Sequence, residues 1–124
     1  MTVQVIGYAR VSTKEQDLSL QLDALSKYGC DRIFTDKISS VKERQGLTDA
    51  LGYLRDGDTL VVWKLDRLCR SLPDLIKISE QIRTAGAQLV SITESIDTST
   101  PAGRLYFNIL GALGQMEREL IQER

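Results

Sequence analysis

The 124-residue sequence contains no histidine. Without an imidazole, the serine–histidine–acid arrangement of acyl transfer and the commonest zinc ligand sets are both excluded. Any proton transfer or charge stabilisation must therefore be carried out by arginine, lysine and acidic side chains.

Cysteines and long apolar runs are also scarce. Cys30 and Cys69 have no CxxC spacing, and no apolar leader precedes a cleavage site. Both observations favour free thiols in a reduced, cytoplasmic protein. No stretch approaches the roughly 20 consecutive apolar residues that span a bilayer, so no membrane partner is expected.

The chain lacks an excess of positive charge, because 16 Lys and Arg face 17 Asp and Glu, for a net charge of −1. A domain with this balance makes a poor electrostatic footprint on a polyanion, and any phosphate recognition must be local. The last residues, 116–124, still have a helical pattern without a stop signal. We therefore expect the sequence to be part of a longer protein.

Apolar runs that alternate with amphipathic segments predict an α/β fold with a mostly parallel central sheet flanked by helices. The expected strands are residues 3–8, 32–35, 59–63 and 88–92. Gly29 and Gly86 are the expected stops of two helices, and Ser71 followed by Asp74 is the expected cap of the helix that ends at Gly86. The polar stretch 36–46 is predicted to be a mobile loop and the best candidate for a lid. We expect an α/β core over residues 1–100 and the start of a long helix over residues 101–124.

The final helix is apolar nearly all round in its first half, where Phe107, Ile109, Leu110 and Leu113 cannot all face one core. A second copy of the chain is the expected cover, which makes this an oligomerisation helix. Glycines in the same helix are tolerable if another helix approaches closely.

Two arginine-bearing segments, residues 8–13 and 64–71, follow the ends of predicted strands. Parallel strands present their carboxyl ends at one rim, so the segments are expected to bring the Ser12 hydroxyl close to three guanidinium groups. Guanidinium donors match phosphate oxygens, and this combination indicates attack on a phosphate ester.

Each of these residues also has a purely structural interpretation. Ser12 with Glu15 forms a capping box, which explains the serine without chemistry. Residues three and four apart on one helical turn, such as Asp66 and Arg70, commonly make exposed ion pairs. Arg44, alone in the polar loop, is explained as a solvated charge.

Taken together, the segments resemble the catalytic domain of the serine recombinases, the resolvase and DNA invertase family. The resemblance runs nearly end to end, with residues 96–99 and 103–104 closer to the invertases. It is carried by Gly7–Thr13, Gln21, Ile33–Lys37, Arg44–Leu47, Gly57–Leu68, Arg70–Ser71 and Met116–Ile121.

The resemblance implies that Ser12 attacks a DNA phosphodiester, forms a 5′-phosphoserine link and releases a 3′-hydroxyl, with strand exchange and religation in a tetramer. No metal or other cofactor is implied. The partners implied are a double-stranded recombination site, further copies bound through residues 101–124, and accessory DNA-bending proteins. The other site residues implied are Arg10, Arg67 and Arg70 as active-site arginines, Arg44 as a further one, Asp66 as the adjacent acid, Gln21 as an active-site amide, and Tyr8 as a neighbour.

The sequence departs from the family pattern at Cys69 and Ser40, where glycines are usual, and its loop is one residue shorter than in some resolvases. The family's basic C-terminal helix-turn-helix domain is absent from this sequence, which fits the neutral charge. The rival hypothesis is a non-catalytic α/β interaction or regulatory domain whose arginines are structural and whose last helix dimerises.

Overall fold

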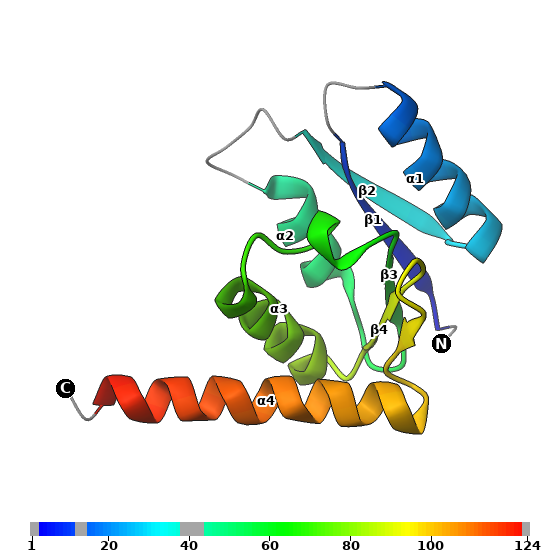
Figure 1. The fold of residues 1–124 in the computed structure, drawn as a ribbon. Helices are drawn as coiled ribbons and strands as arrows, with labels where there is room; N and C mark the ends of the chain where they lie inside the picture. Colours follow the sequence, from blue (N-terminus) through cyan, green and yellow to red (C-terminus); the bar gives the residue numbers. More distant parts are fainter. Residues whose placement is uncertain (1–2, 12–14, 38–43, 123–124) are drawn as a thin grey trace.

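The computed structural model describes residues 3–11, 15–37 and 44–122. Five strands form one sheet in the order β2-β1-β3-β4-β5 (Figure 1). The strands are β1 (Val5–Val11), β2 (Arg32–Lys37), β3 (Thr59–Val62), β4 (Gln88–Ser91) and β5 (Ile96–Asp97). The first four pair in parallel, which confirms the predicted sheet, whereas β5 pairs antiparallel to β4.

Helices cover both faces of the sheet, as expected for an α/β fold. The helices are α1 (Glu15–Tyr28), α2 (Gln45–Tyr53), α3 (Leu72–Thr84) and α4 (Pro101–Gln122), with a 3₁₀ turn η1 (Leu65–Arg67) after β3. Along β3 the side chains alternate between the faces: Leu60 and Val62 join the larger core with α2, α3 and α4, and Val61 joins the smaller core with Leu25 of α1. Period-two alternation therefore divides the core into two layers.

The observed strands differ from the predicted ones mainly at their ends. β1 runs to Val11 instead of ending at Tyr8, so Arg10 belongs to the strand. β2 runs to Lys37, and the predicted mobile loop over 36–46 is wrong at both of its ends, because α2 already begins at Gln45. Its middle, residues 38–43, lies outside the described residues. The two-residue β5 was missed because so short a strand has no readable alternation.

The predicted helix stops and one predicted cap are present. Gly29 and Gly86 have φ values of +99° and +77°, and this left-handed conformation suits glycine after a helix. At the start of α3, the Ser71 hydroxyl accepts a hydrogen bond of 3.3 Å from the backbone N–H of Asp74. The sequence signals that end α1 and begin α3 are therefore confirmed.

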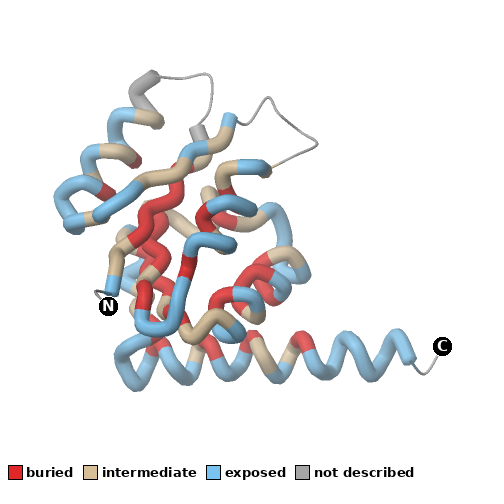
Figure 2. Tube along the Cα trace, turned by 180° about the vertical axis from the view of Figure 1, so that it is seen from behind, coloured by how far each residue is buried: buried red, intermediate tan, exposed pale blue. Residues whose placement is uncertain are grey.

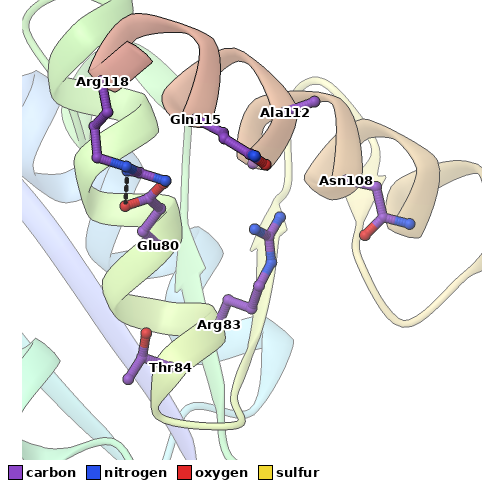
Figure 3. A pocket seen from close by; sticks show the side chains of 8 residues that line it. Glu80, Arg83, Thr84, Asn108, Ala112, Gln115 and Arg118 are labelled. Atoms are coloured by element: carbon purple, nitrogen blue, oxygen red, sulfur yellow. Dashed lines mark hydrogen bonds and ion pairs between the residues drawn. The ribbon is translucent and has the colours of Figure 1, made fainter. Parts of the chain in front are cut away.

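Helix α4 starts at Pro101, as predicted, and packs across α3. A hollow of about 530 Å³ lies between them, where Arg83 points from α3 towards α4 and Glu80 is ion-paired with Arg118 (Figure 3). A Cβ atom at Gly111 would lie 2.1 Å from Arg83 Nη1, and one at Gly114 would lie 2.6 Å from Glu80 Oε1. The helix that closely approaches these glycines is α3 of the same chain.

The buried face of α4 is narrow. It consists of Gly103, Phe107, Leu110 and Gly114, and the last turns of the helix extend beyond the core with exposed residues (Figure 2). Ile109 keeps 49% of its surface exposed. No helix of the described residues has the length and apolar character needed to cross a bilayer.

Candidate active site

The candidate site lies where β1 and β3 adjoin at the carboxyl edge of the sheet. β1 has β2 on one side and β3 on the other, so the connections from these strands leave in opposite directions. Parallel α/β sheets bind ligands at such topological switch points. The elements that end here supply Arg10 from β1 and Asp66 from η1.

The Arg10 side chain joins the two strands across this edge. Its Nη2 donates a hydrogen bond to the main-chain carbonyl oxygen of Asp66. Its Nε is buried and has no hydrogen-bond partner among the described residues. The two arginine-bearing segments thus meet at one edge of the sheet, and the contact between them is made by the main-chain carbonyl oxygen of Asp66.

Gln21, on helix α1, holds the main chain of Arg10 through two hydrogen bonds. Its Oε1 accepts a hydrogen bond of 3.2 Å from the Arg10 N–H, and its Nε2 donates one of 2.9 Å to the Arg10 carbonyl oxygen. Gln21 is fully buried. These contacts give the predicted active-site amide a definite role in fixing the backbone from which the arginine projects.

Tyr8 lies in the core, and its hydroxyl donates a hydrogen bond of 2.7 Å to the Asp36 carboxylate. Burial raises the pKa of Tyr8 well above its ordinary value, and the hydrogen bond to Asp36 acts in the same direction. The same carboxylate accepts hydrogen bonds from the N–H groups of Gly46 and Leu47, at 2.7 and 2.9 Å. Tyr8 and Asp36 therefore anchor the start of α2 beside the site.

Arg44 is not the solvated charge of the structural interpretation. Its Nη1 and Nη2 donate to the two oxygens of Asp74 at 2.8 and 2.9 Å. The hydrogen bond to Arg44 lowers the pKa of Asp74 from its ordinary value, and the same bond raises the pKa of Arg44. The pair forms part of the wall of a hollow of about 340 Å³ between α2 and α3.

Arg67 and Arg70 flank this region on η1 and on the segment before α3. The guanidinium carbon of Arg67 lies 6.0 Å from the ring centroid of Trp63, within the range of a cation–π contact. The main-chain N–H of Arg70 donates a hydrogen bond of 2.9 Å to Asp74. Arg70 is exposed.

The thiol of Cys69 lies among these charges. Burial raises its pKa, Asp74 and Asp66 act in the same direction, and Arg10 and Arg44 oppose them. Arg10 and Arg44 come from different elements, and both reach the turn after β3, where they contact the carbonyl oxygens of Asp66 and Leu68. Cys69 stands where the family usually has glycine. Its thiol donates a hydrogen bond to the Leu65 carbonyl oxygen at 3.2 Å.

Two residues singled out in the sequence cannot be placed. Ser12 and Ser40 lie outside the described residues, so the nucleophile and the capping box with Glu15 both stay predictions. In the sequence, Ser12 follows Arg10 by two residues.

Two acidic residues, Asp36 and Asp74, organise the site without a local signal in the sequence. Asp36 was assigned to a mobile loop, and Asp74 was interpreted only as part of the cap of α3. Their partners lie 28 and 30 residues away along the chain, so no local spacing reveals them. Among the residues that the structure describes, no group of three or more His, Cys, Asp or Glu side chains could hold a metal ion.

The comparisons with known proteins define the class of the domain. The family described as "Resolvase, N terminal domain" matches residues 5–124, and the chain belongs to this family. The N-terminal catalytic domain of TP901-1 integrase superposes with a TM-score of 0.71 at 32% identity, covering 94% of this chain and 97% of that one. A resolvase family site-specific recombinase from Streptococcus pneumoniae shares the fold, with a TM-score of 0.68 at 24% identity over 98% and 91% of the two chains.

Curated relatives give the particular branch. The chain is 56% identical over 121 residues to a DNA-invertase of Escherichia phage P1 and 52% identical over 120 residues to the DNA-invertase hin of Salmonella typhimurium. These matches cover 97% and 96% of this chain but only 65% and 63% of the relatives. The chain therefore spans slightly less than two thirds of their length.

Proposed function

We propose that this chain is the catalytic domain of a site-specific DNA recombinase in which Ser12 is the nucleophile. The observation that carries the proposal is that Arg10 and Arg44 both reach the turn after β3, through contacts with the carbonyl oxygens of Asp66 and Leu68. Ser12 follows Arg10 by two residues, and Arg67 and Arg70 lie on the adjoining turn. The resolvase-family membership and the invertase relatives support the same conclusion.

The proposed reaction is a phosphoryl transfer without loss of the ester. The Ser12 oxygen forms a bond to phosphorus, the bond from phosphorus to the 3′-oxygen breaks, and the proton lost by the serine ends on that 3′-hydroxyl. Attack of a 3′-hydroxyl from the exchanged strand on the phosphoserine reverses the step and restores the serine. The number of phosphate esters does not change, so the reaction requires no energy source.

The arginines supply the electrostatic contribution. Charge on the non-bridging oxygens grows or is redistributed in the transition state, and preorganised guanidinium donors stabilise it. Arg10 is held at the carboxyl edge by the hydrogen bond from its Nη2 to the Asp66 carbonyl oxygen. Replacement of Arg10, Arg67 or Arg70 by alanine is expected to lower cleavage by about 100-fold each, which corresponds to about 3 kcal/mol.

Covalent trapping tests the proposal. Full-length protein incubated with nicked suicide substrates should give a denaturation-resistant protein–DNA band in the presence of EDTA. Ser12→Ala should abolish the band and leave site binding nearly intact, whereas Ser19→Ala, a change on the exposed surface of α1, should not alter it. Absence of the band in the wild type would favour the rival, a non-catalytic interaction domain.

The partners in this proposal are duplex DNA at a recombination site, other copies of the chain and accessory DNA-bending proteins, in the cytoplasm and on the nucleoid. Self-association through α4 to a dimer or tetramer is supported by a row of exposed apolar side chains. The row consists of Leu105, Ile109, Met116, Leu120 and Ile121.

Self-association and folding can be tested separately on this helix. Ile109 is half exposed, whereas Leu110 is buried in the core. Ile109→Glu is expected to give a folded monomer and Leu110→Glu an unfolded chain, with Asn108→Glu as the neighbouring exposed control. Sedimentation and circular dichroism distinguish these states, and a wild type that stays monomeric at high concentration would contradict the assignment.

A further inference from the structure

One carboxylate, that of Asp74, connects two arginines of the candidate site. Its two oxygens accept hydrogen bonds from Nη1 and Nη2 of Arg44 at 2.8 and 2.9 Å, and Oδ2 also accepts one from the main-chain N–H of Arg70 at 2.9 Å. Such two-point pairing fixes the plane of the guanidinium as well as its position.

Capping of α3 does not account for the pairing with Arg44. The Ser71 hydroxyl accepts the N–H of Asp74, and Asp74 Oδ2 reaches back to the main-chain N–H of Arg70 beside this cap, but both carboxylate oxygens also bind the Arg44 guanidinium from the start of α2. The ion pair also differs from an ordinary surface pair, because the side chains of Arg44 and Asp74 are only 23% and 16% exposed. Pairs that are partly withdrawn from water are less screened and better held.

No other described contact orients the head of Arg44 comparably. Arg44 stands at the N-terminal boundary of α2 and makes no side-chain cap there. Beyond Asp74, its guanidinium has only a long contact of 3.4 Å with the Leu68 carbonyl oxygen. A guanidinium has five N–H donors, so pairing with one carboxylate leaves donors for a phosphate oxygen.

The neighbourhood points the same way. Arg44, which Asp74 holds, contacts the Leu68 carbonyl oxygen, and Arg10 contacts that of Asp66 two residues earlier, so the two arginines adjoin the same turn. The lengths of the three contacts to Asp74 are those of well-made charge-assisted hydrogen bonds.

We propose that Asp74 is a positioning residue of the recombination reaction: it holds the head of Arg44 and the main chain of Arg70 so that both arginines meet the same phosphodiester. This inference rests on the proposed function. Asp74 itself touches no DNA and exchanges no proton in the reaction. Its contribution is orientation, for which displacement by about 1 Å can lower a rate by about 100-fold.

A double-mutant cycle tests the inference in the full-length protein. The rate of covalent complex formation on a nicked suicide substrate is measured for wild type, Asp74→Asn, Arg44→Ala and the double variant. We expect Arg44→Ala to lower the rate by about 100-fold and Asp74→Asn by about 10- to 100-fold. The double variant should be no slower than Arg44→Ala, because Asp74 acts through Arg44.

Two control variants separate positioning from a general loss of structure. Asp49→Asn makes the same chemical change at an exposed position whose described contact is with Gln45, and Ser71→Ala removes the cap of α3 while it leaves Asp74 in place. Both should cleave at nearly the wild-type rate. Site binding and the urea midpoint are measured for every variant, and Asp74→Ser replaces Asp74→Asn in the cycle if the asparagine variant does not fold.

The outcomes are distinct. A wild-type rate for Asp74→Asn, a rate increase, or losses that multiply in the double variant would each overturn the positioning role while the wild-type band upholds the proposed function. A rate increase would identify the pair as an inhibitory contact instead. Absence of covalent complex in the wild type would overturn the proposed function and this inference with it.

Discussion

Gly103→Ala should displace the start of α4 from the segment against which it packs. In the native structure, a Cβ atom at this position would lie 1.8 Å from the Asp97 carbonyl oxygen and 2.8 Å from the Thr98 Cα. Both neighbours are main-chain atoms, so no side-chain rotation relieves the contact, and the helix must withdraw by about an ångström from the segment that carries β5.

The magnitude follows from what this withdrawal disturbs. Overpacking of this kind costs about 1–3 kcal/mol, and loss of the hydrogen bond from the Gly103 N–H to the Thr100 hydroxyl, 3.1 Å long, removes a helix cap worth about 1 kcal/mol. Alanine returns at most about 1 kcal/mol through its better helix propensity. We expect a net loss of about 1–3 kcal/mol in the free energy of unfolding.

The chain offers a matched control in Gly52→Ala. Gly52 also lies within a helix, α2, but a Cβ atom there would meet nothing within 4 Å. This variant should gain about 0.5–1 kcal/mol. Urea unfolding at a fixed protein concentration, followed by the fluorescence of the single tryptophan, Trp63, compares the two. If Gly103→Ala proves as stable as Gly52→Ala, the close packing of α4 against the Asp97–Thr98 main chain is refuted.

Three further predictions concern the titratable and polar groups. Tyr8→Phe should lower the free energy of unfolding by about 1.5–3 kcal/mol, since it removes a buried hydrogen bond to the Asp36 carboxylate, and an unchanged urea midpoint would argue against that bond. Burial raises the pKa of Cys30 to about 11 and also raises that of Cys69, so both thiols should react with iodoacetamide at pH 8 at least about tenfold more slowly in the folded chain than in urea, as mass spectrometry can follow. The folded-state pKa of Asp74 lies below its ordinary value of 3.8, so its ion pair stabilises the fold above that pH, and this stabilisation is lost as the pH falls through the lowered pKa. The stability advantage of wild type over Asp74→Asn should therefore shrink in acid. An advantage that is independent of pH would contradict the pairing.

Much of the fold could be predicted because its signals are local. The apolar run of β3, the Ser71 cap and the glycine stops at residues 29 and 86 each depend on neighbours within one element, and each is confirmed. The end of β1 was misjudged because Arg10 is polar. The main chain of Arg10 belongs to β1, whereas its side chain contacts the Asp66 carbonyl oxygen at the carboxyl edge of the sheet.

The site was only partly predictable, for a related reason. Topology alone placed Arg10 near Asp66, since both follow parallel strands to one edge. The partners of Arg44 and Tyr8 come from segments 30 and 28 residues away. In the sequence, a carboxylate that receives such a long-range hydrogen bond looks the same as one that caps a helix or faces water.

Gln21 determines which elements hold the main chain of Arg10. β1 pairs with β3 only as far as Tyr8, opposite Val62, and beyond that point the Gln21 amide takes the place of a neighbouring strand by pairing with both main-chain groups of Arg10. The main chain of Arg10 is thereby held by α1 and by β2, and only its side chain reaches the turn after β3, so that turn can shift while the backbone of Arg10 stays fixed. Exchange of the Arg10 amide hydrogen with solvent should accordingly follow the opening of α1, whatever the opening rate of β3.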